Sequence, residues 1–341
     1  MQAIMLIAIL FLWQSFLAPA VGATTLSEAI ERLDAAAVRA ALKAGADPNE
    51  RDRLGRSAID IVFNSIFSPK GRASAIQQVN VEEKAIEVLN VLLEGGTILK
   101  PMDADSHLGS SVLAGSYKLA KIFLERGANP NGMKDITGLI DAPIVVATKK
   151  GHPEIIKLLL EFGATPLNPS VTAQIRFIGA AEKGDLEGMK LELSKGATVD
   201  GKTPNGETGL VNAAKECRVE AVSFLLSNGA TPNLPGKHVI MGGIAPLHAA
   251  LVQNVRTFQS RGCDVIVRSL LAAGAYVSST DDLTKMTPLH IAARSNNAVA
   301  VRMLLEAGAN VMPKDADGKT PLDYAVSGEV IKLLKAHGAK E

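Results

Sequence analysis

Two cysteines and six histidines are the residues of this 341-residue chain that could perform redox or metal chemistry. The cysteines are Cys217 and Cys263, each near an expected junction between two short helices. A disulfide needs Cα atoms within about 7 Å, whereas packed helices lie about 8–10 Å apart. An inserted segment at 254–261 could close that gap. Two interpretations therefore stay open, a disulfide or two partly buried free thiols.

Metal, cofactor and catalytic chemistry has no support in the remaining motifs. The histidines lack the short intervals that metal ligands need, and there is no Cys-x-x-Cys pair. The acidic turn at 315–318 resembles the start of a calcium loop but lacks the closing glutamate. Gly242-Gly243 is not followed by the Gly-Lys-Ser/Thr of a phosphate loop. We expect no metal, no cofactor, no catalytic residue and no enzyme activity.

Charge and aromatic content argue against nucleic acid as a partner. The chain has 36 Lys+Arg against 35 Asp+Glu, and aromatic residues make up 4%. Nucleic-acid sites need a clustered basic excess, and single strands also need aromatic platforms for stacking. The partner that we expect is another protein.

The elements that position these residues are clearest in the stretch 285–309. Thr287 is suited to cap a helix whose first residue is Pro288, because proline has a fixed φ and no N–H to leave unpaired. A second apolar helix is expected at about 298–307, and Gly308 follows it as a left-handed cap. Neither helix is long enough to be stable alone, so the unit needs copies beside it.

Copies of this unit recur along the chain. Each ends in a leucine-rich helix followed by a glycine, and six of the eight intervals between these glycines span 30 to 36 residues. The glycines are Gly45, Gly96, Gly127, Gly163, Gly196, Gly229, Gly274, Gly308 and Gly338. The period is that of ankyrin repeats.

The motifs also resemble those of the ankyrin-repeat family. Its Thr-Pro-Leu-His turn is matched at 287–290, and in modified form at 320–323, 245–248 and 142–145. Its Gly-His opening of the second helix is matched at Gly151-His152. The resemblance implies an all-α solenoid of about nine helix-turn-helix repeats, caps included, joined by β-turn loops over 24–341. It also implies that His248 and His290 bond backbone atoms between repeats.

The segment 1–23 is strongly apolar and carries no charged side chain. Small residues at its end favour a signal peptide that is removed after Ala23. The alternative is an uncleaved membrane anchor, since about 20 apolar residues can span a bilayer. We expect export, to the periplasm in a Gram-negative bacterium and otherwise to a secreted or luminal location.

Several segments depart from the repeat pattern. An exposed loop, with a short helical turn at most, is expected at 65–83, and the second repeat should resume at Lys84. A degenerate turn is expected at 106–108, and a lengthened turn at 233–243. The insertion at 254–261 is expected to separate the two helices of the seventh repeat.

The family resemblance implies a concave groove, formed by turn tips and first helices, that binds a partner protein. The residues expected there are Arg51, Arg53, Met133, Lys134, Lys149, Lys150, Lys183, Lys202, Lys215, Lys237, Lys285, Met286, Arg294 and Lys314. Because this set is mostly basic, we expect a partner with acidic character.

The function that we expect is that of a monomeric, exported scaffold or adaptor, without catalysis. Three alternatives stay open: a dedicated inhibitor or chaperone-like partner of one exported enzyme, a membrane-tethered scaffold, and a hydrolase that uses the insertion in the seventh repeat.

Overall fold

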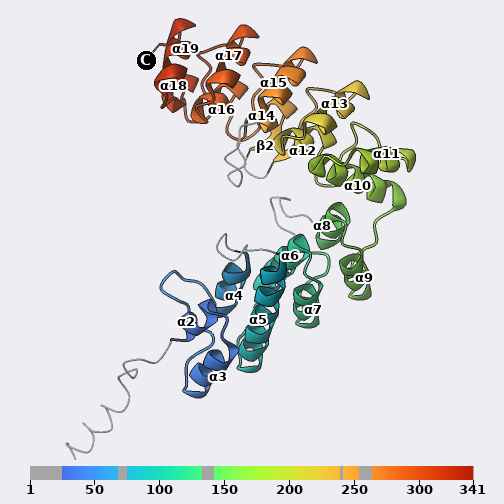
Figure 1. The fold of residues 1–341 in the computed structure, drawn as a ribbon, viewed down its shortest axis with the longest axis vertical. Coiled ribbons are helices and arrows are strands. Elements are labelled where there is room, and N and C mark those ends of the chain that lie inside the picture. Colours follow the sequence, from blue (N-terminus) through green and yellow to red (C-terminus); the bar gives the residue numbers. More distant parts are fainter. Residues whose placement is uncertain (1–24, 68–74, 133–141, 239–240, 253–262, 341) are drawn as a thin grey trace, which may run out of the picture. The chain divides into compact units, whose positions relative to one another are not determined.

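The computed structural model describes residues 25–67, 75–132, 142–238, 241–252 and 263–340 (Figure 1). The segment 1–23, Met133, Lys134 and the insertion at 254–261 lie outside these ranges. The chain divides into two compact units, Met1–Lys100 and Pro101–Glu341. The two units are described separately below.

The first unit contains two helix pairs. Helix α2 (Leu26–Glu31) pairs with α3 (Ala35–Lys43), and α4 (Ala58–Phe67) pairs with α5 (Ala75–Glu94). The expectation of an exposed loop at 65–83 was wrong, because α4 extends into this range and α5 begins well before Lys84. The helix breakers Pro69 and Gly71 both fall within 68–74, outside the described residues. From residue 75 to the end of α5 the chain contains neither glycine nor proline, so nothing interrupts the helix.

In its described residues the second unit contains seven consecutive helix pairs. They are α6 (Pro101–Ala114) with α7 (Tyr117–Glu125), α8 (Pro143–Lys150) with α9 (Pro153–Glu161), α10 (Pro169–Lys183) with α11 (Leu186–Ser194), α12 (Gly209–Lys215) with α13 (Val219–Ser227), α14 (Pro246–Leu251) with α15 (Cys263–Ala272), α16 (Pro288–Arg294) with α17 (Ala298–Glu306), and α18 (Pro321–Tyr324) with α19 (Gly328–Ala336). The first helix of each pair packs against the first helix of the next. The result is the expected all-α stack of helical repeats.

A two-stranded hairpin is added to this helical architecture. Strands β1 (Gly236–His238) and β2 (Gly242–Ile244) are antiparallel, with Lys237 opposite Gly243. The lengthened turn expected at 233–243 thus contains paired strands. The expected turn at 106–108 was wrong, since these residues lie inside α6, where His107 and Leu108 are buried. Helix α6 begins at Pro101 and ends before Gly115, and Gly109 between them is tolerated within the helix.

The helix ends follow from local sequence, as the pair α16/α17 shows. Pro288 is the first residue of α16, and the Thr287 hydroxyl accepts a hydrogen bond from the His290 N–H at 3.5 Å. Gly308 follows α17 with a φ of +85°. The other eight periodic glycines also have positive φ, between +85° and +97°. A Cβ at Gly308 would meet no atom within 4 Å, so glycine is required there for backbone conformation and not for space.

The core of each unit lies between its helices. In the first unit Ile30, Val38, Val62 and Leu92 are almost completely buried. In the second unit one continuous cluster of buried residues runs from Ala173 in α10 to Ala339 after α19. Each helix pair therefore buries its apolar side chains against its neighbours, which explains how such short helices are stabilised.

Candidate binding surface

Main-chain hydrogen bonds join four consecutive turns of the second unit into one strip. The Lys237 N–H donates to the Gly206 carbonyl at 3.1 Å, and β1 pairs with β2. The Asp282 N–H then donates to the Gly243 carbonyl at 3.1 Å, and the Ala316 N–H to the Thr284 carbonyl at 2.9 Å. We call this strip the turn ribbon; it consists of residues 202–208, 236–238, 241–244, 281–286 and 314–319.

Buried aspartates hold the individual turns of the ribbon in shape. Asp281 accepts hydrogen bonds from the backbone N–H groups of Leu283, Thr284 and Met286. Asp315 accepts from the Asp317 and Lys319 N–H groups, at 2.9 Å each. Both carboxylates are thus occupied by their own turns. This is the structural role of the acidic sequence at 315–318, which resembles a calcium loop in its first residues.

Tyr324 adds a further bond to the last of these turns. Its hydroxyl donates to Asp315 Oδ2 at 2.6 Å. This hydrogen bond to a carboxylate raises the pKa of Tyr324 to about 12. The Lys319 ammonium lies 5.4 Å from the centre of the same ring, a distance at which a cation interacts favourably with aromatic electrons.

His248 and His290 connect neighbouring repeats beneath the ribbon, as expected. His248 Nε2 lies 3.2 Å from the Met286 carbonyl, and His290 Nε2 lies 3.0 Å from the Lys319 carbonyl. His290 Nδ1 accepts the Thr287 N–H at 3.0 Å, so Nε2 must carry the ring proton and donate it. Burial lowers the pKa of both histidines, although their carbonyl partners act in the opposite direction. Both rings are fully buried and serve as neutral structural links.

A cluster of charged residues lies on α8, α10 and the first turn of the ribbon. Lys149 Nζ lies 2.9 Å from Glu182 Oε2 and 2.5 Å from Glu207 Oε1. Lys150 Nζ lies 2.5 Å from the other oxygen of Glu182. Burial by itself would raise the pKa of Glu182, but the two ammonium groups outweigh this effect and hold it at about 2. Glu182 is therefore ionised at physiological pH and paired with both lysines.

Gly179 in α10 allows this cluster to form. A Cβ at this position would lie 2.3 Å from the Lys149 carbonyl oxygen, which is shorter than any tolerable contact. Glycine thus lets the backbones of α8 and α10 approach closely enough for Lys149 to reach Glu182 on the next helix.

The remaining candidate residues differ in their surroundings. Lys202, Lys285 and Lys314 are exposed on the ribbon, and no ion pair with another described residue is formed by any of them. Exposed Leu283 lies on the same strip, with 59% of its surface accessible. Lys237 is half-buried in β1, and Arg294 is exposed at the end of α16. Arg51 and Arg53 are exposed on a turn of the first unit.

Two expectations about surface exposure were wrong. Met286 is only 2% exposed, because its N–H and carbonyl bond Asp281 and His248 and its side chain packs into the core. Lys149 is 9% exposed, since it is enclosed by the two glutamates. Lys215 is half-buried and lies 3.6 Å from Glu216, whereas exposed Lys183 donates to the Lys150 carbonyl. The basic character expected for the first helices is thus largely neutralised within the chain.

Comparison with known proteins agrees with this repeat architecture. Residues 258–341 match the family of ankyrin repeats, in three copies. Residues 258–341 of this chain are therefore ankyrin repeats. Human Neurogenic locus notch homolog protein 4 is 43% identical over 101 residues, which cover 27% of this chain and 5% of that protein. Human Rabankyrin-5 is 39% identical over 99 residues, which cover 27% of this chain and 8% of that protein.

The human Mitochondrial disaggregase is also similar, at 38% identity over 80 residues, or 20% of this chain and 11% of that protein. The chain thus spans about a tenth or less of the length of these three relatives. The similarity concerns the repeats and not the rest of those proteins.

Asparagine links between the ankyrin repeats were missed in the sequence. Asn233 Nδ2 donates to the Gly274 carbonyl at 3.0 Å, and its Oδ1 accepts the Tyr276 N–H at 2.7 Å. Asn49 and Asn131 make the same two bonds. Each side-chain amide donates to the carbonyl of the next capping glycine, and each side-chain oxygen accepts the N–H two residues after that glycine. The available signal was an Asn or Asp four residues after four of the periodic glycines. These side chains set the spacing between adjacent repeats.

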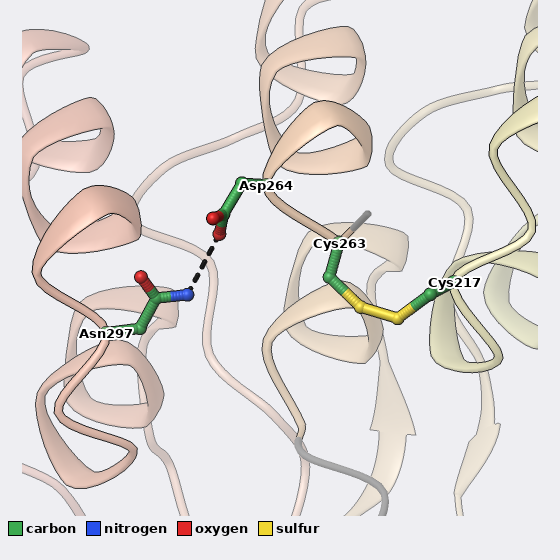
Figure 2. The surroundings of a disulfide bond; sticks show 4 residues. All are labelled: Cys217, Cys263, Asp264 and Asn297. Carbon is green, nitrogen blue, oxygen red and sulfur yellow. Dashed lines mark hydrogen bonds between the residues drawn. A yellow bond between two sulfur atoms is a disulfide. The ribbon is translucent and has the colours of Figure 1, made fainter. Parts of the chain in front are cut away.

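Cys217 and Cys263 are joined as a disulfide between adjacent ankyrin repeats (Figure 2). Their Cα atoms are 5.0 Å apart, within the range that such a bond requires. Cys217 lies in the turn between α12 and α13, and Cys263 is the first residue of α15. Both residues are partly accessible to solvent.

Within the described ranges, no group of three or more potential metal-ligating side chains is present. Of the helices that the structure describes, none combines the length and the apolar character needed to cross a bilayer.

Proposed function

We propose that this ankyrin-repeat protein is an exported, non-enzymatic module that binds a partner protein along its turn ribbon. The observation that carries the proposal is the ribbon itself, in which main-chain bonds connect four turns into one strip with lysines and a leucine exposed on it. A surface held in place by its own backbone loses little conformational freedom when a partner binds. The proposed partner presents acidic side chains.

The acidic preference rests on Lys202, Lys285 and Lys314. Lys149 and Lys150 are paired with Glu182 and Glu207 and have little charge left to offer a partner. Reversing their charge would break internal ion pairs, so a loss of partner binding could come from a loss of stability. Reversing the charge of the three ribbon lysines leaves those pairs intact.

The proposed export has two independent supports. The apolar segment 1–23 has the composition of a signal peptide, and small residues precede its predicted cleavage site. The disulfide between Cys217 and Cys263 is the second, because such bonds persist in oxidising compartments and are rare in the cytosol. The periplasm of a Gram-negative bacterium or the secretory route of another cell would provide that environment.

Affinity capture tests the proposal. The full chain, tagged at its C-terminus, is expressed in its source cell as wild type and as the triple variant Lys202→Glu, Lys285→Glu, Lys314→Glu. The matched control reverses Lys43, Lys157 and Lys332, which are exposed on second helices and change the net charge equally. We expect wild type and control to retain the same protein, and the ribbon variant to bind it at least about tenfold more weakly at low salt.

Equal retention by the two triple variants would contradict a role for the ribbon. The intact mass of the purified protein tests export separately: loss of residues 1–23 is expected, whereas a full-length chain in the membrane fraction would indicate a tethered scaffold.

A further inference from the structure

The junction between the two helices of a pair is built in one way in most of the stack. The first helix ends, one residue adopts a left-handed backbone conformation, and the following residue is the N-cap of the second helix. The left-handed residues are Leu33, Gly115, Gly151, Gly184, Cys217 and Asn296. A single residue of this kind therefore sets where the second helix begins.

The pair α14/α15 has no such short junction. Helix α14 ends at Leu251, and Val252 caps it in an extended conformation, with a φ of −69° and a ψ of 106°. Helix α15 begins at Cys263, and residues 253–262 between them lie outside the described ranges. A connection of this length does not by itself fix where α15 begins relative to α14.

Contacts to the repeats on both sides hold the first turn of α15 instead (Figure 2). Cys263 is bonded to Cys217 in the preceding repeat. The next residue, Asp264, accepts a hydrogen bond from Asn297 Nδ2 of the following repeat at 2.9 Å. Asn297 is itself the N-cap of α17, where its Oδ1 accepts the Ala300 N–H at 3.0 Å. The start of α15 is thus connected to the junctions of both neighbouring pairs.

The position of Cys217 supports a specific need for its side chain. Its φ is +53°, a conformation that is unfavourable for residues with a Cβ. Three of the equivalent positions in other pairs are glycines. Cys217 has an unfavourable backbone conformation at a junction from which its sulfur reaches the start of α15.

We propose that the Cys217–Cys263 disulfide fixes the start of α15, which a long connection separates from α14, and makes the placement of α15 dependent on redox state. When the bond is formed, α15 begins at a defined point between α13 and α17. When it is reduced, the first turn of α15 is released, and its protection from solvent falls while that of distant repeats does not change.

Reduction by dithiothreitol is the chemical step that exposes this dependence. One thiolate of the reagent attacks a sulfur of the disulfide, and the second thiol closes a ring that releases the other cysteine. The reagent becomes a cyclic disulfide, and Cys217 and Cys263 each take up one proton. The step needs no other reactant.

Hydrogen exchange of the full chain, followed by mass spectrometry, tests the proposal. Amides of α15 are compared in the oxidised and dithiothreitol-treated wild type, with α9 as the internal control in the same molecule. The Cys217→Gly variant removes the disulfide and also relieves the backbone strain, because glycine is the residue found at the equivalent positions Gly151 and Gly184. It therefore shows the effect of losing the bond without a strained residue at position 217. The Cys263→Ser variant also removes the disulfide but leaves Cys217 in its strained backbone conformation.

We expect reduction to accelerate exchange in α15 by at least about tenfold and to leave α9 unchanged. Cys217→Gly should show the fast α15 exchange without reductant and no further response to it. The proposal is overturned by equal α15 protection in oxidised and reduced wild type, or by an equal acceleration in α9 and α15. It is also overturned if alkylation without reductant labels both cysteines of the native protein. Wild-type reduction decides the question even if a variant fails to fold.

Discussion

The eighth and seventh helix pairs of the stack perform the same packing task with different connections. In the eighth pair, α16/α17, Thr287 caps the first helix together with His290, and left-handed Asn296 connects the two helices. In the seventh, α14/α15, the cap position is Ala245, which makes no side-chain cap, and a long segment separates the helices. A β-hairpin precedes the seventh pair, and a disulfide holds the start of its second helix.

Despite these differences the two pairs share the features that build the stack. Both begin with Pro-Leu-His, both histidines bond the next turn, and both second helices end before a left-handed glycine. The comparison teaches that helix packing and turn contacts define the repeat, whereas the connection between its helices is replaceable if another constraint takes over its role.

The largest expected effect is the loss of a buried leucine from either second helix. Leu270 in α15 and Leu304 in α17 are both fully buried, so each substitution by alanine should lower the free energy of unfolding by about 2–5 kcal/mol. Denaturant unfolding measures this, with the 51% exposed Val299 as the control position for Val→Ala. After reduction, Leu270→Ala should cost less than Leu304→Ala. Unchanged costs in the reduced protein would mean that the two connections are equivalent.

The capping glycines should respond alike in both pairs. Gly274→Ala and Gly308→Ala should each destabilise by about 1–2 kcal/mol, since both have positive φ and open space around the new Cβ. Gly109→Ala, inside α6 and equally open, should instead stabilise by about 0.5–1 kcal/mol. Thermal or denaturant midpoints of the three variants distinguish these outcomes. If Gly308→Ala unfolds at the same midpoint as the wild type, the backbone conformation does not require glycine at this position.

Acidification should weaken both pairs by a smaller amount. Burial lowers the pKa of His248 and His290 below the ordinary 6.5, so the unfolded chain binds more protons as the pH falls. Stability should therefore be lost as the pH falls below about 6.5. The lowered pKa of Glu182 changes stability only below its ordinary value of 4.5, so Glu182 does not affect the pH range in which the histidines titrate. Substitution of His290 by Gln should reduce the slope of stability against pH, and an unchanged slope would contradict the assignment.

Local chemistry explains why so much of the eighth pair was predictable. Thr287, Pro288 and Gly308 each act through their own backbone geometry, and α17 ends one residue from the expected position. The seventh pair was less predictable because its constraints connect distant residues. The bond from Cys217 to Cys263 and the paired strands depend on how repeats stack, which no short stretch of sequence contains.

The turns of the proposed binding surface were predictable from the sequence, and the exposure of its side chains was less so. Lys202, Lys285 and Lys314 are exposed as expected, because tip residues have no neighbour to cover them. Lys149 and Met286 were misjudged because their burial depends on Glu182, Glu207 and His248, which come from other repeats. Residue type indicates charge, but only the stack determines which charges are already paired.

Lysine footprinting of the complex with the captured partner is the most direct test of the binding surface. An amine-reactive label is applied to the free and bound protein, and each lysine is read by mass spectrometry. The account predicts that the partner protects Lys202, Lys285 and Lys314 and leaves Lys43, Lys157 and Lys332 as reactive as in the free protein. Protection of the second-helix lysines with full reactivity on the ribbon would contradict it.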